Sequence, residues 1–149
     1  MNNGFYTKEV LKHFKSPHNY GKIKDPDGLG RVGNMVCGDE MQVYIKVGKD
    51  KTIKDIKFET FGCVAAIATS SIVTDLAKKK TIEEALKITK QDVIDSLGGL
   101  PPIKIHCSVL AIDALSEAVY DYYLKNNIDI PEDLEKKHNL TIKRESCHS

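Results

Sequence analysis

The sequence predicts an α+β domain in which helices pack on one face of a three-stranded antiparallel sheet. Three strand-like stretches follow one another between residues 30 and 61, too closely for the long crossovers that parallel strands need. After residue 63 the pattern changes to helical spacing of apolar residues and stays helical to about residue 127. The chain has 149 residues without an internal repeat, which fits one domain with a sizeable core. A helix, then strands, then helices is an order typical of α+β proteins.

The first half of the chain contains one helix, a loop and the predicted sheet. Val10, Leu11 and Phe14 lie at helical spacing after Thr7, which is a plausible N-cap. A segment rich in Pro, Gly, Asn and Asp follows at residues 16–30 and is expected to be a loop. The strands are expected at residues 30–40, 41–47 and 52–61, with a hairpin turn at residues 48–51.

The second half is predicted to be helical. Helices are expected at residues 64–80, 81–88, 89–97 and 105–127, and the second of these opens with a capping box made by Thr81 and Glu84. Gly98 and Gly99 end the third. We predict one domain over residues 1–127, followed by a polar tail at residues 128–149 with one short helix starting near Pro131 and disorder beyond it.

The charge and hydropathy of the chain exclude several classes of function. Lys and Arg number 22 and Asp and Glu number 21, so no overall field favours nucleic acid or a membrane surface as a partner. No apolar run is long enough to span a bilayer. The N-terminus lacks the features of a secretory signal or a transit peptide, which predicts a cytoplasmic protein.

The cysteines carry the functional signal. In a reducing compartment, cysteines are more often ligands or reactive thiols than disulfides, although a lone one is often a small buried hydrophobe. Cys37 lies between the first two strands, Cys63 lies between the third strand and a helix, and His106 and Cys107 open the long helix. Such turns and element ends crowd one edge of a small domain. The sequence therefore predicts a Cys3His site at one edge of the sheet, suited to zinc, copper(I) or an iron–sulfur cluster.

Local features favour thiolates and an open site. A helix N-terminus, where Cys63 and Cys107 are predicted to lie, stabilises an anion by roughly 0.3–1 kcal/mol. Gly38 and Gly62 let the backbone approach a bulky inorganic group, although Gly38 with Asp39 also fits an ordinary turn. No pair of cysteines has the close spacing of a zinc finger or of a bacterial ferredoxin. Ligands that are single and far apart indicate a site that can be filled and emptied.

Four motifs together resemble the iron–sulfur cluster assembly scaffold family, which includes IscU and the N-terminal domain of NifU. The resemblance covers residues 6–124. The first motif is Y-x-x-x-V-x-x-H-x-x-x-P-x-N-x-G, present as Tyr6, Val10, His13, Pro17, Asn19 and Gly21. The others are GNMVCGDEM around Cys37, FGCVAA around Cys63 and LPPIKIHCSVLAIDA around Cys107. Val64 departs from the family, where a second glycine is common.

The resemblance implies a function and a ligand set. Family members receive sulfur as persulfide from a cysteine desulfurase, combine it with iron into a 2Fe-2S cluster, and pass the cluster to apo-proteins. Carried over to this chain, the ligands are Cys37, Cys63 and Cys107, with His106 or Asp39 as the fourth. Cys107 is the first candidate for the persulfide acceptor, because a thiolate at a helix start is expected to be exposed. Lys104 is a plausible partner for the Asp39 carboxylate, and the protein as purified is also able to carry zinc.

The segment Leu100, Pro101, Pro102, Ile103 and Lys104 resembles the family's binding site for a DnaK-class chaperone, which acts with a J-protein. Pro102 disfavours a helical conformation at Pro101, so the long helix is expected to start just before His106 and Cys107. The two extended prolines would then present a ready-made peptide to a chaperone. A plain linker that stops helix formation is the alternative interpretation.

Three other functions use the same residues. One is a zinc-bound sulfur acceptor, a partner of a cysteine desulfurase in the SUF system; family members of that type carry an insertion before the second cysteine and lack the histidine, unlike this chain. Another is a structural zinc module. The third is a Cys/His hydrolase, disfavoured because neighbours on a helix point about 100° apart. We expect His13 and His18 to lie at the surface, His138 on a charged face, and Cys147 to be dispensable.

Overall fold

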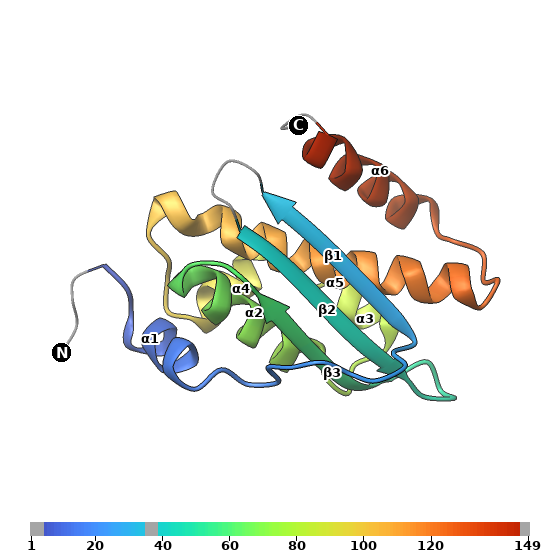
Figure 1. Cartoon of the computed structure of the whole chain (residues 1–149), viewed down its shortest axis with the longest axis horizontal. Helices are drawn as coiled ribbons and strands as arrows, with labels where there is room; N and C mark the ends of the chain where they lie inside the picture. The colour runs from blue at the N-terminus through green and yellow to red at the C-terminus, as the bar shows by residue number, and fades with distance from the viewer. Residues whose placement is uncertain (1–4, 35–38, 147–149) are drawn as a thin grey trace.

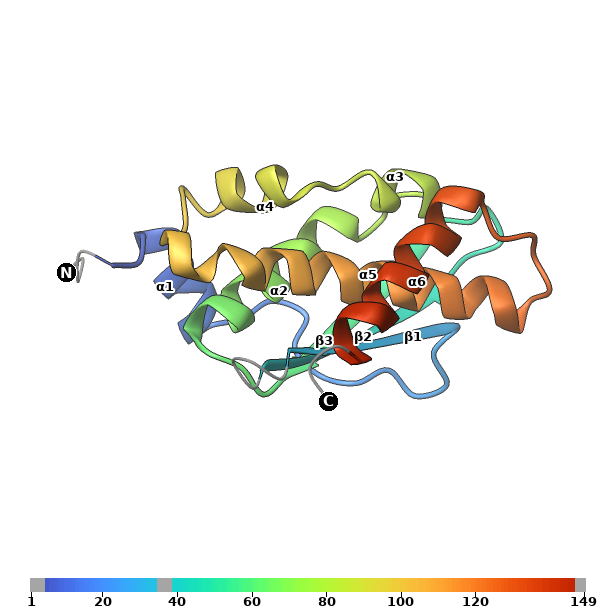
Figure 2. The ribbon, with the colours of Figure 1, turned by 90° about the horizontal axis from the view of Figure 1, so that it is seen from above.

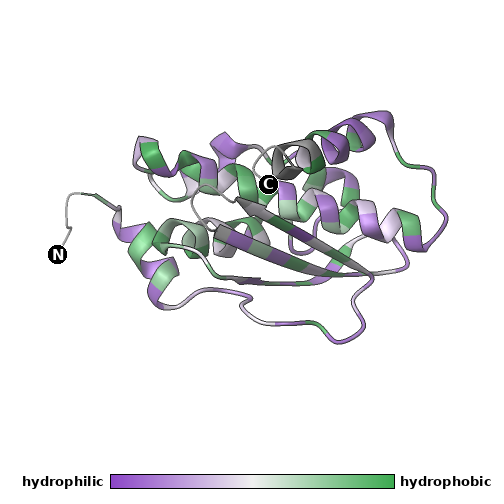
Figure 3. Cartoon of the chain, turned by 45° about the horizontal axis from the view of Figure 1, so that its top comes forward, coloured by the Kyte–Doolittle hydropathy of each residue, from purple (hydrophilic) through white to green (hydrophobic). Residues whose placement is uncertain are grey.

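The structure of the chain, a computed structural model, describes residues 5–34 and 39–146 (Figure 1). Its sheet has three antiparallel strands in the order β1 (Gly28–Asn34), β2 (Asp39–Val47) and β3 (Ile53–Thr60). Polar and apolar residues alternate along these strands (Figure 3), as a half-buried sheet requires. The predicted antiparallel meander is confirmed.

Helices cover one face of this sheet, also as predicted (Figure 2). The long helix α5 (Ile105–Lys125) packs on β1 and β2, and α2 (Val64–Ala77) packs beside it on β3. The N-terminal helix α1 (Lys8–Lys15) lies against α2. Two short helices, α3 (Ile82–Leu86) and α4 (Lys90–Ser96), connect α2 to α5.

The core fills the layer between the sheet and these helices. Phe58, Ile45 and Ile56 of the sheet are fully buried there. The central helix α2 is buried on most sides, which suits its small side chains, and the hydroxyl groups of Thr69 and Thr74 bond to carbonyl oxygens of its own backbone. Thr69 Oγ1, for example, donates to the carbonyl oxygen of Ala65 at 2.7 Å.

Close packing of α5 on β1 depends on two glycines. A Cβ atom on Gly28 would collide with the carbonyl oxygen of Ala118, and one on Gly30 would collide with the backbone of Ala114 and Ala118. The small side chains of Ala114 and Ala118 on α5 complement this approach. The glycines therefore set how closely α5, whose first turn carries His106 and Cys107, lies on the sheet.

The caps confirm most of the predicted helix boundaries. Thr7 accepts a hydrogen bond from the Val10 amide, and Thr81 with Glu84 forms the expected capping box. Hydrogen bonds from Thr81 to the carboxylate hold the pKa of Glu84 below its usual value. After α4 the chain turns at Gly98 and Gly99, whose φ angles are +72° and +114°.

The C-terminal segment differs from the expectation of a short helix followed by disorder. Residues Glu132–Ser146 form one helix of 15 residues, α6, which packs against α5 and β1. His138 is largely buried rather than on an open charged face: its ring stacks on Tyr120 with centroids 3.7 Å apart, and its Nδ1 lies 2.7 Å from Glu117 Oε2. Leu134, a residue of this helix, is also buried. These contacts explain why a segment with few apolar residues is ordered.

Replacing His138 by Ala should weaken the docking of α6. The variant loses an aromatic stack worth about 0.5–1.5 kcal/mol and a hydrogen bond to a charged group worth about 1.5–3 kcal/mol. We expect faster amide hydrogen exchange throughout α6. Lys136→Ala is the control, because its ion pair with Glu132 is exposed and contributes little. Equal exchange protection in the two variants would show that the His138 contacts do not hold the helix.

Within the described ranges, no helix combines the length and the hydropathy that crossing a membrane requires.

Candidate metal centre

The structure brings Cys63 and Cys107 together at one end of the molecule. Cys63 is the N-cap of α2, three residues after the end of β3 and with an extended backbone, and Cys107 is the third residue of α5. Because α2 and α5 pack side by side, the two Sγ atoms lie 3.8 Å apart although 44 residues separate them in sequence. The predicted convergence is therefore present for these two thiols.

His106 joins the same group. Its Nε2 atom lies 3.7 Å from Cys107 Sγ. The argument used against a hydrolase, that neighbours on a helix point about 100° apart, therefore does not keep this imidazole from the thiol, because the side chain is long enough to turn back toward it. The hydrolase alternative therefore loses that objection; Cys107 itself is 0% exposed.

Each of the two distances to Cys107 Sγ suits a pair of ligands on one metal ion. Two sulfurs bound at about 2.3 Å to one tetrahedral ion lie about 3.8 Å apart, and a sulfur and an imidazole nitrogen lie about 3.6 Å apart. The measured separations of 3.8 Å and 3.7 Å agree with both values. Two thiolates and an imidazole form a soft ligand set appropriate to zinc or to iron in a sulfide cluster.

Exposure differs between the two thiols in a way the sequence did not predict. Cys107 is buried, whereas Cys63 is partly exposed. The reason given for Cys107 as the persulfide acceptor, an exposed thiolate at a helix start, is therefore wrong in its premise.

Lys104 supplies positive charge beside the thiols. The negative charge of a Cys63 thiolate raises the pKa of Lys104 above its ordinary value, burial opposes this, and Cys107 contributes in the same direction as Cys63. Lys104 thus interacts with the cysteine site directly. Its expected pairing with Asp39 stays a prediction, because the structure does not describe the Asp39 side chain.

The backbone of Asp39 lies at the end of the sheet from which β3 leads to Cys63. Asp39 opens β2 opposite Asn34, and the carbonyl oxygen of the next residue, Glu40, accepts hydrogen bonds from Thr60 Oγ1 at 2.6 Å and from the Phe61 amide at 3.1 Å. These bonds fix the start of β2 next to the segment that leads into Cys63. Cys37 lies outside the described residues, so its place in the site stays a prediction.

The segment Leu100–Lys104 differs in shape from the expected extended peptide. Pro101 is extended but buried, and Pro102–Lys104 form a turn of 3-10 helix, η1, that leads into α5. Ile103 is 70% exposed; Phe61, which lies two residues before Cys63, is also a large exposed apolar residue, at 80%. A partner would therefore contact Pro102 and Ile103 first. The prediction that the long helix starts just before His106 is confirmed, because α5 begins at Ile105.

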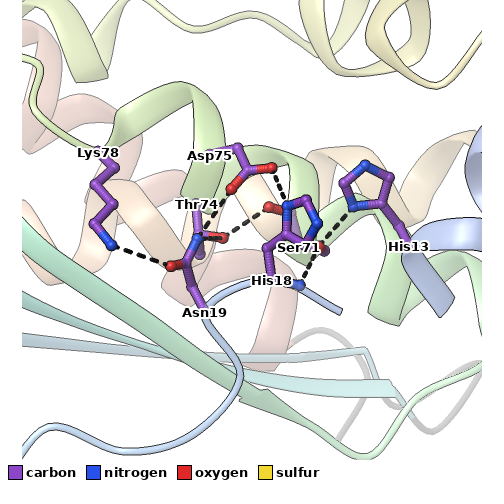
Figure 4. Close-up of polar contacts among 7 residues, drawn as sticks. All are labelled: His13, His18, Asn19, Ser71, Thr74, Asp75 and Lys78. Atoms are coloured by element: carbon purple, nitrogen blue, oxygen red, sulfur yellow. Dashed lines mark hydrogen bonds and ion pairs between the residues drawn. The ribbon is translucent and has the colours of Figure 1, made fainter. Parts of the chain in front are cut away.

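A second group of polar side chains was missed by the sequence analysis. His13, expected at the surface, is only 5% exposed; burial lowers its pKa below the ordinary value, and the neighbouring His18 lowers it further. Its ring lies 4.7 Å from that of His18, which in turn contacts Asp75 (Figure 4). His13 belongs to the first family motif, but nothing in the sequence linked it to Asp75, 62 positions further along the chain.

Comparisons with known proteins agree on one family. A sequence profile of the NifU-like N terminal domain matches residues 5–129. The chain is 63% identical over 121 residues to the iron-sulfur cluster assembly scaffold protein IscU 1 of Archaeoglobus fulgidus, covering 81% of this chain and 78% of that protein. It is 47% identical over 126 residues to the scaffold protein IscU of Azotobacter vinelandii, covering 83% of this chain and 98% of the relative.

Solved structures share the fold. A putative iron-sulfur cluster assembly scaffold protein for the SUF system from Fervidobacterium islandicum superposes with a TM-score of 0.66 at 22% identity, covering 80% of this chain and 99% of that one. The N-terminal part of a nitrogen-fixing NifU-like protein from Brucella abortus gives the same TM-score at 18% identity.

Proposed function

The chain belongs to the NifU-like N-terminal domain family, and on that premise we propose that it is a scaffold for iron–sulfur cluster assembly. The observation that supports this most strongly is the approach of Cys107 Sγ to Cys63 Sγ at 3.8 Å and to His106 Nε2 at 3.7 Å. Relatives that are 46% to 63% identical to this chain, over 80% to 83% of its length, are named as such scaffolds, which favours this function over a zinc-bound sulfur acceptor.

The finer proposal concerns the cargo and its ligands. We propose a 2Fe-2S cluster, built from iron and from sulfur delivered by a cysteine desulfurase, and held by Cys37, Cys63 and Cys107. The fourth ligand is His106 or Asp39. The Lys104 ammonium offsets part of the negative charge that three thiolates and two sulfides bring to the site. Apo iron–sulfur proteins would receive the cluster, and a DnaK-class chaperone would bind the segment Leu100–Lys104 through the exposed Pro102 and Ile103.

Anaerobic reconstitution tests this function. Purified chain is incubated with ferrous iron, cysteine, a cysteine desulfurase and a thiol reductant that supplies the electrons for reducing persulfide sulfur to sulfide, and is then separated from small molecules. We expect iron and acid-labile sulfide in equal amounts on the protein, with the visible absorbance of a 2Fe-2S cluster. A chain that keeps zinc, takes up sulfur only as persulfide and never gains iron would be a sulfur acceptor, and the scaffold proposal would be wrong.

Sulfur delivery should leave its first persulfide on Cys107. Although this thiol is buried, His106 Nε2 at 3.7 Å is positioned to take its proton and leave the thiolate that accepts sulfur. Mass mapping after a short reaction with desulfurase and cysteine, without iron, locates the added sulfur atom. A sample without cysteine is the control. Persulfide found on Cys63 alone would show that exposure, rather than activation by the imidazole, selects the acceptor.

Replacing Asp39 by Ala should make the cluster last longer. A hard carboxylate oxygen is a poor ligand for a soft site, and its exchange with solvent favours release. We expect the decay of cluster absorbance in air to slow by about three- to tenfold, which corresponds to ~0.7–1.4 kcal/mol in the barrier. Transfer should slow accordingly.

Two controls accompany this variant. Asp133→Ala removes an exposed carboxylate from α6 and should leave cluster decay unchanged. Thermal unfolding of apo Asp39→Ala detects the alternative that Asp39 only shapes the turn after Gly38, in which case the fold weakens. A cluster that decays faster in Asp39→Ala would mean that the carboxylate supports the cluster, contrary to this account.

A further inference from the structure

His13, His18 and Asp75 form a compact group away from the cysteine site (Figure 4). His13 comes from α1, His18 from the loop after it, and Asp75 from α2. One potential ligand atom from each residue lies within 4.8 Å of the other two. Asp75 follows Cys63 by twelve residues along α2, about 18 Å at the rise of an α-helix. The group is therefore separate from the cysteine centre.

Neighbouring polar groups hold the two histidines. Ser71 Oγ lies 2.7 Å from His13 Nδ1 and accepts a hydrogen bond from the backbone amide of His18 at 2.8 Å. A single hydroxyl group on α2 thus positions the ring of one histidine and the backbone of the other. The His13 ring is almost fully enclosed and cannot move far.

The carboxylate is oriented in a similar way. Asp75 Oδ1 accepts a hydrogen bond from Asn19 Nδ2 at 3.1 Å, and Asn19 also bonds to Thr74 Oγ1 and to Lys78 Nζ. Asp75 Oδ2 lies 2.6 Å from His18 Nδ1. Hydrogen bonds of this kind, from residues just outside a ligand set, are what orient imidazole and carboxylate ligands in metal sites.

We propose that His13, His18 and Asp75 bind one divalent transition-metal ion of borderline softness, such as Zn²⁺ or Fe²⁺. Two imidazoles and one carboxylate suit such ions and leave coordination positions open for water. The ion would replace the direct contact between His18 and Asp75 by two bonds to itself. Side chains of His18 and Asp75 are 51% and 37% exposed, which gives the ion a path from solvent and gives both ligands freedom to close around it. Buried His13 is the fixed point of the site.

Binding would join α1 and its following loop to α2 through a metal ion. An ion that binds only the folded chain raises its stability in proportion to the logarithm of the ion concentration. The same three side chains would otherwise serve only as a hydrogen-bonded contact between these elements, and that role needs no metal. A dependence of stability on the ion therefore distinguishes the two roles.

The test removes the competing sites first. In a background variant all four cysteines are replaced by Ser, and His106 and His148 by Ala, so that neither the cysteine centre nor the C-terminal Cys-His pair can bind. Equilibrium dialysis should then find one equivalent of Zn²⁺ at micromolar free ion, and Zn²⁺ should raise the melting temperature by a few degrees. Co²⁺ bound there should show no sulfur-to-cobalt charge-transfer absorbance.

Two further substitutions identify the ligands. Asp75→Asn keeps a side chain of the same shape beside His18 but should lower Zn²⁺ affinity at least tenfold, as should His18→Ala. His138→Ala, which alters a His–Glu pair elsewhere, should leave binding unchanged. If the background variant is unfolded, the same substitutions are made in the native chain. That chain should bind a second equivalent of Zn²⁺ besides the one at the cysteine site, and each substitution should remove one equivalent from the total. The proposal would be overturned if Zn²⁺ did not bind at this second site, or if the binding survived both substitutions.

Discussion

Replacing Cys63 or Cys107 by Ser should abolish the stable cluster altogether. Their Sγ atoms lie 3.8 Å apart, the separation of two thiolates on one metal ion, so each variant leaves that ion one soft ligand short. A serine hydroxyl is a harder ligand and is not ionised at neutral pH, so it cannot substitute for a thiolate. After reconstitution and desalting, sulfide content should fall to background in both variants.

The control for this result is Cys147→Ser. The resemblance places no ligand at Cys147, the third residue from the end of the given sequence, so cluster content should equal that of the unaltered chain. The same experiment on Cys37→Ser tests the ligand that the structure does not describe. Near-normal sulfide content in the Cys63 or Cys107 variant, with the apo-protein still folded, would remove that residue from the ligand set.

Replacing Gly30 by Ala should destabilise the fold strongly. The added methyl group meets the backbone of Ala114 and Ala118 on α5, and a backbone gives way less readily than a flexible side chain. Overpacking commonly costs about 1–3 kcal/mol, and we expect the upper end or more here because strand and helix must move apart. Urea unfolding of the apo-protein measures the loss.

Gly48→Ala is the matched control. Its new methyl group would contact the Asp50 carboxylate in the hairpin turn, a side chain that can move. We therefore expect a change well below that of Gly30→Ala. Similar losses in both variants would mean that the approach of β1 to α5 is not as tight as the structure indicates.

Local sequence signals predicted the elements of the fold well. Alternation of Ile56 and Phe58 with Lys57 and Glu59 marks β3, and Thr7 and Thr81 mark helix starts through hydrogen bonds to residues three positions away. These signals succeed because strand alternation and helix capping depend on neighbours in the sequence. Antiparallel pairing followed from the short connections alone.

Features that depend on tertiary contacts were not predictable in this way. The length of α6 depends on the stacking of His138 on Tyr120, 18 positions earlier, which no local pattern reveals. Burial of Cys107 depends on how α5 lies on the sheet and beside α2. The group of His13, His18 and Asp75 forms only because α1 packs on α2.

The approach of Cys63 to Cys107 was predicted, and details around these two thiols were misjudged. The positions of Cys63 and Cys107 at element ends were enough to predict that they converge. Helix geometry was used against a hydrolase with His106 beside Cys107, but it describes Cβ directions and neglects the reach of an imidazole. The conformation of Pro102–Lys104 was also misjudged, because proline is compatible with both an extended chain and the first turn of a helix.

Transfer of a labelled cluster tests the scaffold function most directly. The chain is reconstituted anaerobically with isotopically labelled iron and sulfide, and mixed with an apo-ferredoxin in the presence of an iron chelator. This account predicts that both labels reach the ferredoxin together, at the same rate and in equal amounts, because an intact cluster moves. Iron captured by the chelator while only sulfur reaches the ferredoxin would contradict it, and would identify the chain as a sulfur donor instead.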